Sequence, residues 1–460
     1  MDTIREIPKI LQTALSNGGD FAEIFIEERV STSIGCEDNK VERIISGTDR
    51  GAGLRVMVGD MTAYASTNDL TPSGLRELAH RVSKGISAHV EKYLFPDGYA
   101  SKFAKKEVTY PSSVTTSEKV AKVLEGNEVA WNCGKAITQV HVRYGDSQQR
   151  VIIANSDGLF VTDERIYTIF LVQAVARKNG VIQTGYEPVG GTVGFEIFNT
   201  VSPSTIARLA AEQALRMLEA PPAPTGVMPV VISSEAGGTM IHEAVGHSLE
   251  ADLVQKGLSI FAGKIGEKIA SEIVSVHDDA TLPGRRGSFA CDDEGTPSER
   301  TVLVENGILK TYMYDLTTAR KENRSSTGNG RRESCRHRPI PRMTNTLIVP
   351  STAKPEDVVA ATDKGLFVRK MGGGQVNTIN GDFMFEVSEA YLIRDGEIKE
   401  PVRGASLIGN SSRVLSGIDM VANDLGFAVG TCGKDGQGVP VSDAQPTLRI
   451  EGITVGGTNA

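Results

Sequence analysis

Residues 237–250 have the sequence GGTMIHEAVGHSLE, and this stretch decides how the second half of the chain is organised. Two of the seven histidines, His242 and His247, stand here five positions apart, and Glu243 directly follows the first. The apolar residues of the stretch recur at steps of three and four, which is the spacing of one buried helix face. Two imidazoles and one carboxylate are what a metal-activated hydrolase requires, as ligands of the ion and as a base for water.

The spacing of the two histidines is unusual for a metal-binding helix. The common zinc helix has its histidines four residues apart on one face, whereas His242 and His247 are five apart. In a straight α-helix, five steps turn the second side chain by roughly 140° from the first, so the two could not reach one ion. A π-type turn, or a helix that breaks at Gly246, would bring them together. We therefore predict a distorted or terminating helix at Gly246; the alternative is that the histidines are ordinary core or surface residues.

A catalytic zinc ion usually has three protein ligands and one open position, so a third ligand is needed. The candidates in the second half of the chain are carboxylates and the residues His277, His337, Cys291, Cys335 and Cys432. Cys432 is favoured because it lies in a predicted glycine-rich loop, residues 430–436, whose glycines let the backbone approach a ligand closely, and nearby Lys434 favours a thiolate. A small buried thiol in a turn is the alternative interpretation of Cys432.

Acidic residues around the histidines have possible roles in such a site. Glu243 would lie about 100° round the helix from His242, beside the ion, which suits a general base for water. The alternative for Glu243 is a surface or salt-bridged glutamate. Glu250 or Asp252 could orient a ligand histidine, although solvated surface acids are equally common.

Two glycine-containing stretches are further candidates for binding a substrate. Residues 328–333 (GNGRRE) place arginines after a turn, where they could hold a peptide carboxylate in a bidentate pair. Residues 371–375 (MGGGQ) offer bare backbone for hydrogen bonds with an extended substrate, and they lack the features of a phosphate-binding loop. Each stretch could equally be a structural loop.

Bulk properties exclude several classes of protein. The chain has 460 residues, of which 40% are hydrophobic and 23% charged, so a buried core is expected. A net charge of −8 argues against nucleic acid as the main partner. There is no apolar run of 18 residues and no signal-peptide pattern at the N-terminus, so we expect neither a membrane span nor secretion. Five scattered cysteines fit reduced thiols in the cytoplasm.

A proline-rich stretch divides the chain. Residues 221–224 contain three prolines, which cannot continue a helix. We predict an α+β fold with an N-terminal domain over residues 1–220, built from an antiparallel sheet with helices, and a β-rich C-terminal domain over residues 221–460 that carries the metal helix. The predicted helices span residues 3–17, 71–83, 116–125, 202–218, 355–362 and 418–425, and a loop is expected over 93–112. The predicted strands span residues 21–29, 40–45, 53–58, 61–66, 137–144, 150–155, 159–163, 166–176, 227–232, 273–276, 300–304, 308–314, 346–349, 366–369, 383–394, 398–401 and 447–450.

Several stretches of the sequence resemble the TldD/PmbA family, and specifically its TldD-type metallopeptidase subunit. Besides residues 237–250, the matching stretches are DDEGTP at 292–297, GNGRRE at 328–333, PRMTNT at 341–346, CGKDGQ at 432–437 and QPTLR at 445–449. The resemblance runs from near the N-terminus to the end and is densest after residue 227. One departure is the stretch Val441-Ser442-Asp443, where the family leads us to expect small apolar residues.

The resemblance implies a zinc peptidase with His242, His247 and Cys432 as ligands of Zn²⁺ and Glu243 as the base. It further implies that short or unfolded peptides are cleaved inside a chamber formed by a dimer, with the peptide held as an added strand. The second subunit would be either a PmbA-type (TldE) partner or a second copy of the chain. Two alternatives stay open: a non-catalytic peptide-binding or partner subunit, and a cysteine hydrolase that uses Cys432.

Overall fold

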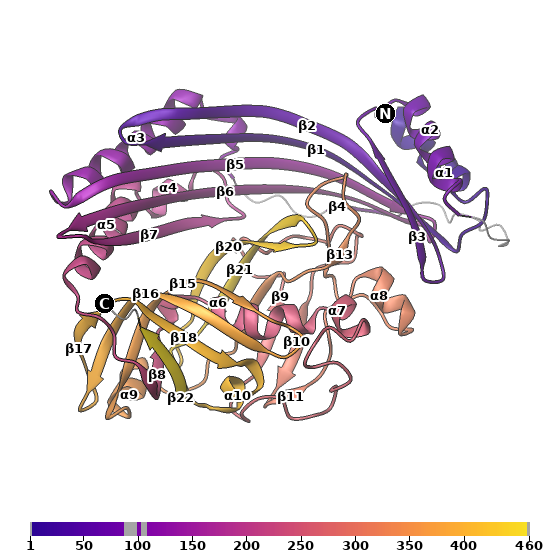
Figure 1. The fold of residues 1–460 in the computed structure, drawn as a ribbon. Coiled ribbons are helices and arrows are strands. Elements are labelled where there is room, and N and C mark those ends of the chain that lie inside the picture. Colours follow the sequence, from indigo (N-terminus) through magenta and orange to yellow (C-terminus); the bar gives the residue numbers. More distant parts are fainter. Residues whose placement is uncertain (1, 87–98, 103–107, 458–460) are drawn as a thin grey trace.

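The computed structural model describes residues 2–86, 99–102 and 108–457. A long curved sheet from the first half of the chain arches over a β-rich second half (Figure 1). Helices and largely antiparallel sheets are both present, so the predicted α+β class is confirmed. Within these ranges no helix has the length and apolar character needed to cross a membrane.

The first half of the chain forms one seven-stranded sheet. Its strands run in the order β3 (Met61–Thr67), β2 (Lys40–Val58), β1 (Phe21–Glu37), β5 (Ile137–Asn155) and β6 (Leu159–Lys178), and both β4 (Tyr99–Lys102) and β7 (Val181–Gly191) pair with β6. One end is covered by α1 (Asp2–Ala14) and α2 (Pro72–Ser83), and the other by η1 (Pro111–Ser113), α3 (Thr116–Asn132), α4 (Ile197–Thr200) and α5 (Pro203–Glu219) (Figure 1). Each helix group packs on its own end of the sheet, so this layer has two separate hydrophobic cores.

The strands of this sheet are longer than the sequence predicts. Glycines and polar residues suggested breaks within residues 40–58, 137–155 and 159–178, yet each of these ranges is one continuous strand. Pairing between neighbouring strands accounts for this length: the hydrogen-bonded ladder of β1 and β2 continues through the glycine-containing middle of β2. Strand β7 was not predicted. The loop predicted over residues 93–112 contains the short strand β4, and part of it lies outside the described residues.

The second half of the chain contains a closed five-stranded barrel. Its members are β8 (Gly226–Ile232), β15 (Lys364–Val376), β16 (Asp382–Arg394), β18 (Ala405–Asn410) and β22 (Leu448–Gly457), with β17 (Glu397–Val402) and β19 (Ile418–Val421) added at the side. Closure follows because β15 pairs with both β8 and β16, which removes the free edges of the sheet. Short helices α9 (Pro355–Ala360) and α10 (Ser411–Ser416) flank it. The helix predicted over residues 418–425 is wrong, because residues 418–421 pair with β22 as a strand.

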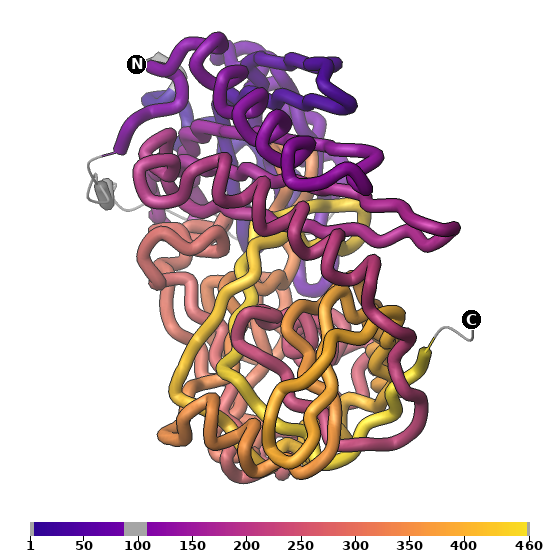
Figure 2. Tube along the Cα trace, turned by 90° about the vertical axis from the view of Figure 1, so that its left-hand side faces the viewer, coloured from indigo at the N-terminus to yellow at the C-terminus, as the bar shows by residue number. Residues whose placement is uncertain are grey.

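A second sheet of this half lies beside the barrel (Figure 1). Its strands run in the order β11 (Ile308–Leu309), β10 (Arg300–Glu305), β9 (Val276–Asp279), β14 (Asn345–Ile348), β21 (Gln437–Gln445) and β20 (Gly426–Lys434). Two predicted strands are wrong in extent: residues 273–275 precede β9, and only the first two residues of 308–314 are a strand. The hairpin of β20 and β21, drawn in yellow, reaches up to the N-terminal layer, where β20 contacts β7 (Figure 2). Helix α8 (Leu316–Lys321) and the strand pair β12 (Gly330–Arg331) and β13 (Ile340–Pro341) complete this half.

Candidate metal centre

The segment that follows β8 changes helix type several times. It forms η2 (Ser234–Ala236), α6 (Thr239–Ile241), the π-helical turn η3 (His242–Gly246), the 3₁₀ turn η4 (His247–Leu249) and α7 (Ala251–Gln255). The backbone N–H of His247 donates to the carbonyl of His242, which is the i→i+5 bond of a π-helix. This wider turn brings residues five apart to the same side, so the distortion predicted at Gly246 is confirmed.

Packing requires a glycine at position 246. The backbone there is helical, with φ of −53°, so no unusual dihedral angle calls for glycine. A Cβ added to Gly246 would lie 1.9 Å from Sδ of Met343, far inside contact distance. The π-helical turn therefore sits directly on the buried Met343 side chain, and conformational freedom, the reason the sequence suggested, is not the cause.

The structure brings His242, His247 and Cys432 together. Sγ of Cys432 lies 3.2 Å from Nε2 of His242 and 3.4 Å from Nε2 of His247. All three atoms that could bind an ion lie within 4.8 Å of one another. The two imidazole rings are perpendicular, with their centroids 5.1 Å apart. Within the described ranges this is the one group of three His, Cys, Asp or Glu side chains with such geometry, and it does not include His277, His337, Cys291 or Cys335.

Strand β20 positions Cys432. The glycine-rich loop predicted around this residue is wrong, because residues 430–434 continue β20, in which Cys432 pairs with Val439 of β21. The turn is made by Asp435 and Gly436, whose φ angles are positive. Burial raises the pKa of the Cys432 thiol, but hydrogen bonds from the two histidines outweigh it and lower the pKa to about 5. This environment favours the thiolate over the thiol, and the thiolate is the form that binds metals.

A carboxylate holds the second nitrogen of each imidazole. Asp443 Oδ1 lies 2.6 Å from Nδ1 of His242, and Glu250 Oε2 lies 2.9 Å from Nδ1 of His247. Such contacts fix the ring so that Nε2 faces the ion, as in many zinc sites. Of the two roles considered for Glu250, the structure supports ring orientation. Asp443 was not predicted as a site residue; the only signal was that it stands where an apolar residue was expected.

Glu243 shares a cavity with the three candidate ligands. The cavity measures about 440 Å³ and is bounded by the helical segment, by residues 428–434 of β20 and by residues 374–376 of β15. Part of the glycine stretch at 371–375 therefore lines the site, which was one of the two interpretations of that stretch. Burial raises the pKa of Glu243, and the two neighbouring histidines oppose this shift.

The arginines of residues 328–333 do not serve as a substrate clamp. Arg331 donates to the carbonyls of Met343 and Pro440, and Arg332 bonds Glu23 of β1 at 2.5 Å. Both arginines are at least 95% buried, so the interpretation as a clamp for a peptide carboxylate is wrong. Arg332 thereby joins the two halves of the protein, whereas both partners of Arg331 lie in the second half.

Further buried ion pairs join the same two halves. Arg55 of β2 lies between Glu23, at 2.8 Å, and Glu294, at 2.5 Å. Arg165 of β6 pairs with Asp293. The acids Asp293 and Glu294 belong to the stretch DDEGTP, whose role is thus to attach the second half of the chain to the N-terminal sheet.

Comparisons with known proteins place these features in a family. Three family models match in sequence: PmbA/TldA metallopeptidase domain 1 over residues 22–85, the central domain over 109–218 and the C-terminal domain over 225–457. The last of these contains all the residues of the candidate metal centre described above.

Two solved structures share the fold. A Thermotoga maritima protein described as a candidate modulator of a DNA gyrase has a TM-score of 0.81 at 24% identity, covering 98% of this chain and 100% of that one. TldE from Thermococcus kodakarensis has a TM-score of 0.80 at 21% identity, covering 99% and 100%.

Curated relatives are more similar in sequence. The chain is 38% identical to a metalloprotease TldD homolog of Haemophilus influenzae, over 96% of this chain and 93% of that protein. It is 36% identical to a metalloprotease of Methanocaldococcus jannaschii, over 98% and 99% of the two chains. These relatives are named as metalloproteases, and the three candidate donors are of the types that bind a divalent metal. With family models along most of its length and relatives of this similarity, the chain belongs to the PmbA/TldD family of metallopeptidases.

Proposed function

We propose that the protein is a zinc-dependent peptidase that hydrolyses short or unfolded peptides, with His242, His247 and Cys432 as ligands and Glu243 as general base. The observation that carries this proposal is the buried set of two imidazole nitrogens and one thiolate. A tetrahedral Zn²⁺ with ordinary bond lengths would separate sulfur from each nitrogen by about 3.5 Å. The distances of 3.2 and 3.4 Å are close to this value. Nitrogen and sulfur donors suit zinc, whereas Mg²⁺ and Ca²⁺ prefer oxygen.

The chain supplies the proton transfers. When bound, the ion would supply a Lewis acid that polarises the peptide carbonyl and favours ionisation of water. Glu243 lines the same cavity as the ligands and can take a proton from water and pass it to the leaving amine. Because burial raises the pKa of Glu243, its carboxylate is a stronger base than that of an exposed glutamate.

Strand β20 offers a place for the substrate backbone. It is the last strand of its sheet, so its outer edge can pair with an extended peptide, beside Cys432 on the same strand. Main-chain pairing provides affinity that depends little on side chains. It requires an extended segment, which short and unfolded peptides have and the interior of a folded protein does not offer. This supports a preference for unstructured substrates.

The partner and the compartment follow from the same proposal. We infer that a second subunit, either a PmbA-type (TldE) protein or a second copy of this chain, closes a chamber over the cavity. The likeness to TldE supports a shared fold between the two kinds of subunit. All five cysteines are free, which supports a reducing compartment such as the cytoplasm.

The test is a comparison of the full-length protein with its Glu243→Gln variant. We expect both to contain about one zinc per chain by mass spectrometry, because the substitution leaves the ligands in place. Hydrolysis of an unstructured fluorogenic peptide should fall by about 10²–10⁴-fold, the usual contribution of a general base. Glu235→Gln is the matched control, because Glu235 lies in the same segment but pairs with Arg369 at the surface.

Two results would overturn the proposal: zinc well below one per chain in both proteins, or full activity in Glu243→Gln. Binding of the peptide by zinc-saturated protein without any hydrolysis would instead indicate a non-catalytic subunit. Activity that survives a chelator but is lost on alkylation of Cys432 would indicate a cysteine hydrolase.

A further inference from the structure

Lys434 is a buried cation that the proposed reaction does not use. It lies on β20 two residues after Cys432, so both side chains leave the same face of the strand. Its Nζ lies 2.6 Å from Asp252 Oδ1, 3.1 Å from Glu250 Oε2 and 3.0 Å from the carbonyl oxygen of Pro341. Only 7% of the side chain is exposed. An ammonium group with three oxygen partners is thus fixed beside the metal centre.

Glu250 connects this lysine to a candidate ligand. Its side chain is fully buried, and Oε2 contacts both Nδ1 of His247, at 2.9 Å, and the ammonium of Lys434. Its other oxygen, Oε1, lies 4.0 Å from Nε of Arg342. A buried carboxylate is costly unless cations surround it. Lys434 and Arg342 place a cation at each oxygen of Glu250, whose Oε2 can accept the N–H at Nδ1, which leaves Nε2 free to bind an ion.

Arg342 ties the same carboxylate to the strand that carries the sulfur. This arginine is fully buried and belongs to the stretch PRMTNT, which the proposed function leaves without a role. Its Nη2 donates to the carbonyl oxygen of Cys432, and its Nη1 donates to the carbonyl oxygen of Gln437 across the hairpin. One guanidinium therefore fixes the backbone of Cys432 while facing Glu250.

We propose that Lys434 and Arg342 are positioning residues that hold two of the three zinc ligands, His247 through Glu250 and Cys432 through its backbone. This cationic brace, made of Lys434, Arg342 and Glu250, rests on the proposed function, since it needs a metal at the site. The brace keeps the imidazole and the thiolate at the spacing that the ion requires. Its strength lies in the charge balance between cations and carboxylates that are largely withdrawn from solvent.

The third ligand is held differently, and this contrast supports the assignment. Asp443, which orients His242, has 11% of its side chain exposed, and within the described ranges no lysine or arginine forms an ion pair with it. Solvent reaches the Asp443 carboxylate, whereas the fully buried Glu250 has Lys434 and Arg342 as its charged partners. The brace is therefore specific to the His247 and Cys432 side of the centre.

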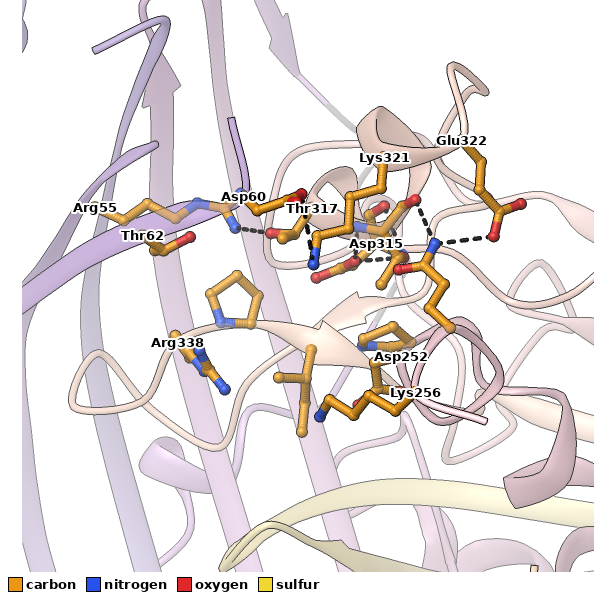
Figure 3. A pocket seen from close by; sticks show the side chains of 15 residues that line it. Arg55, Asp60, Thr62, Asp252, Lys256, Asp315, Thr317, Lys321, Glu322 and Arg338 are labelled. Atoms are coloured by element: carbon orange, nitrogen blue, oxygen red, sulfur yellow. Dashed lines mark hydrogen bonds and ion pairs between the residues drawn. The ribbon is translucent and has the colours of Figure 1, made fainter. Parts of the chain in front are cut away.

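The outer end of the brace borders a second cavity. Asp252, the other carboxylate bound to Lys434, lines a space of about 490 Å³ together with Lys256, Asp315 and Arg338 (Figure 3). Lys434 thus lies between this space and the zinc cavity, which it also lines. When Asp252 is neutralised, Lys434 keeps Glu250 as a charged partner, and Glu250 keeps its contact with His247. We expect Asp252→Asn to weaken zinc binding less than a change at Glu250.

The experiment is a double-mutant cycle on the full-length protein with zinc alone as the probe. Apparent dissociation constants are measured by competition with a chromophoric chelator for wild type, Lys434→Met, Glu250→Gln and the double variant. Each single change should weaken binding by about 10–100-fold, as losses of groups that orient metal ligands do. In the Glu250→Gln background, Lys434→Met should change affinity by less than about threefold, because coupled residues are not additive.

Two further measurements separate positioning from general damage. The visible spectrum of the Co²⁺-substituted protein should change in Lys434→Met, because it reports the geometry around the ion. The urea midpoint shows whether the fold survives. Lys310→Met is the matched control: Lys310 forms an exposed ion pair with Glu305 at 2.9 Å, and its loss should alter neither affinity nor spectrum.

The outcomes are distinct. Absence of zinc binding in wild type overturns the proposed function and the brace with it. Tight binding in wild type together with unchanged affinity in Lys434→Met overturns the brace alone. If Lys434→Met does not fold, the zinc affinities of Glu250→Gln and of the double variant are compared instead. In both proteins position 250 carries no charge that Lys434 would have to balance. A further loss of more than about tenfold between these two contradicts the brace, and a difference within threefold supports it.

Discussion

At the scale of single residues, the candidate centre depends on carboxylates that the chain supplies from two distant places. Glu250 follows its histidine by three positions, whereas Asp443 is two hundred residues from His242 in sequence. Both contact the imidazole nitrogen that does not face Cys432. The donors are therefore oriented before any ion arrives, which reduces the entropy cost of binding one.

The contact between Asp443 and His242 gives a prediction at this scale. Asp443→Asn should weaken zinc binding by about tenfold or more, because a neutral amide oxygen holds the imidazole N–H less strongly than a carboxylate. The measurement is chelator competition, with Asp419→Asn as the control, since Asp419 only pairs with Arg449 at the surface. Equal affinity in wild type and Asp443→Asn would show that the contact does not support the centre.

At the scale of elements, the π-helical turn is the feature that makes the histidine spacing work. Its position could be predicted, because two proposed ligands five residues apart exclude a regular α-helix. Other elements could not be predicted from local sequence. The long strands of the N-terminal sheet override their internal glycines through pairing with neighbours, and the barrel closes only because β15 has two partners. Cys432 was singled out from its glycine-rich surroundings, but Asp443 was missed because proximity across two hundred residues leaves no local signal.

A glycine-to-alanine change tests how the π-helical turn is seated. Gly246→Ala should destabilise the protein by about 1–3 kcal/mol, the usual cost of overpacking, because its Cβ would collide with Sδ of Met343. Zinc affinity should also fall, since the collision displaces the turn that carries His242 and leads directly into His247. Gly373→Ala is the control, because a Cβ there meets nothing within 4 Å. Urea unfolding and chelator competition measure the two effects, and a Gly246→Ala variant as stable as Gly373→Ala would refute this packing argument.

At the scale of the whole molecule, buried pairs of arginine and carboxylate side chains join the N-terminal sheet to the half that holds the candidate metal centre. Arg55, Arg165 and Arg332 each form an ion pair with an acid of the other half, and all three are more than nine-tenths buried. Residues 292–294 and 328–333 therefore stand out in the sequence because they attach the N-terminal sheet to the second half of the chain. The arginines among them do not serve as a substrate clamp. The domain division at residues 220 and 221 stays a prediction, and β8 begins shortly after it at Gly226.

The stability of this contact should depend on pH through Asp293. Burial alone raises the pKa of Asp293, but Arg165 and Arg332 outweigh it and hold the pKa below its ordinary value. Ionised Asp293 therefore stabilises the fold above about pH 4, and the contribution is lost as pH falls below that value. Asp293→Asn should cost about 3–5 kcal/mol at pH 7, because it leaves a buried arginine with one carboxylate fewer.

The measurement is urea unfolding of wild type and Asp293→Asn at several pH values. The difference between the two proteins should be largest near neutral pH and should shrink below about pH 4. Asp157→Asn is the matched control, since Asp157 pairs with Arg320 across the same two halves but at the surface, and its loss should cost at most about 1 kcal/mol. A difference that does not vary with pH would exclude an ionised Asp293 as its source.

The most direct test of the account is X-ray absorption at the zinc edge of the full-length protein. With His242, His247 and Cys432 as ligands, the spectrum should contain one sulfur at about 2.3 Å and nitrogen at about 2.0–2.1 Å. The sulfur contribution should disappear in Cys432→Ser. A wild-type spectrum with only nitrogen and oxygen around the ion, or a sulfur signal that persists in Cys432→Ser, would contradict the proposed centre.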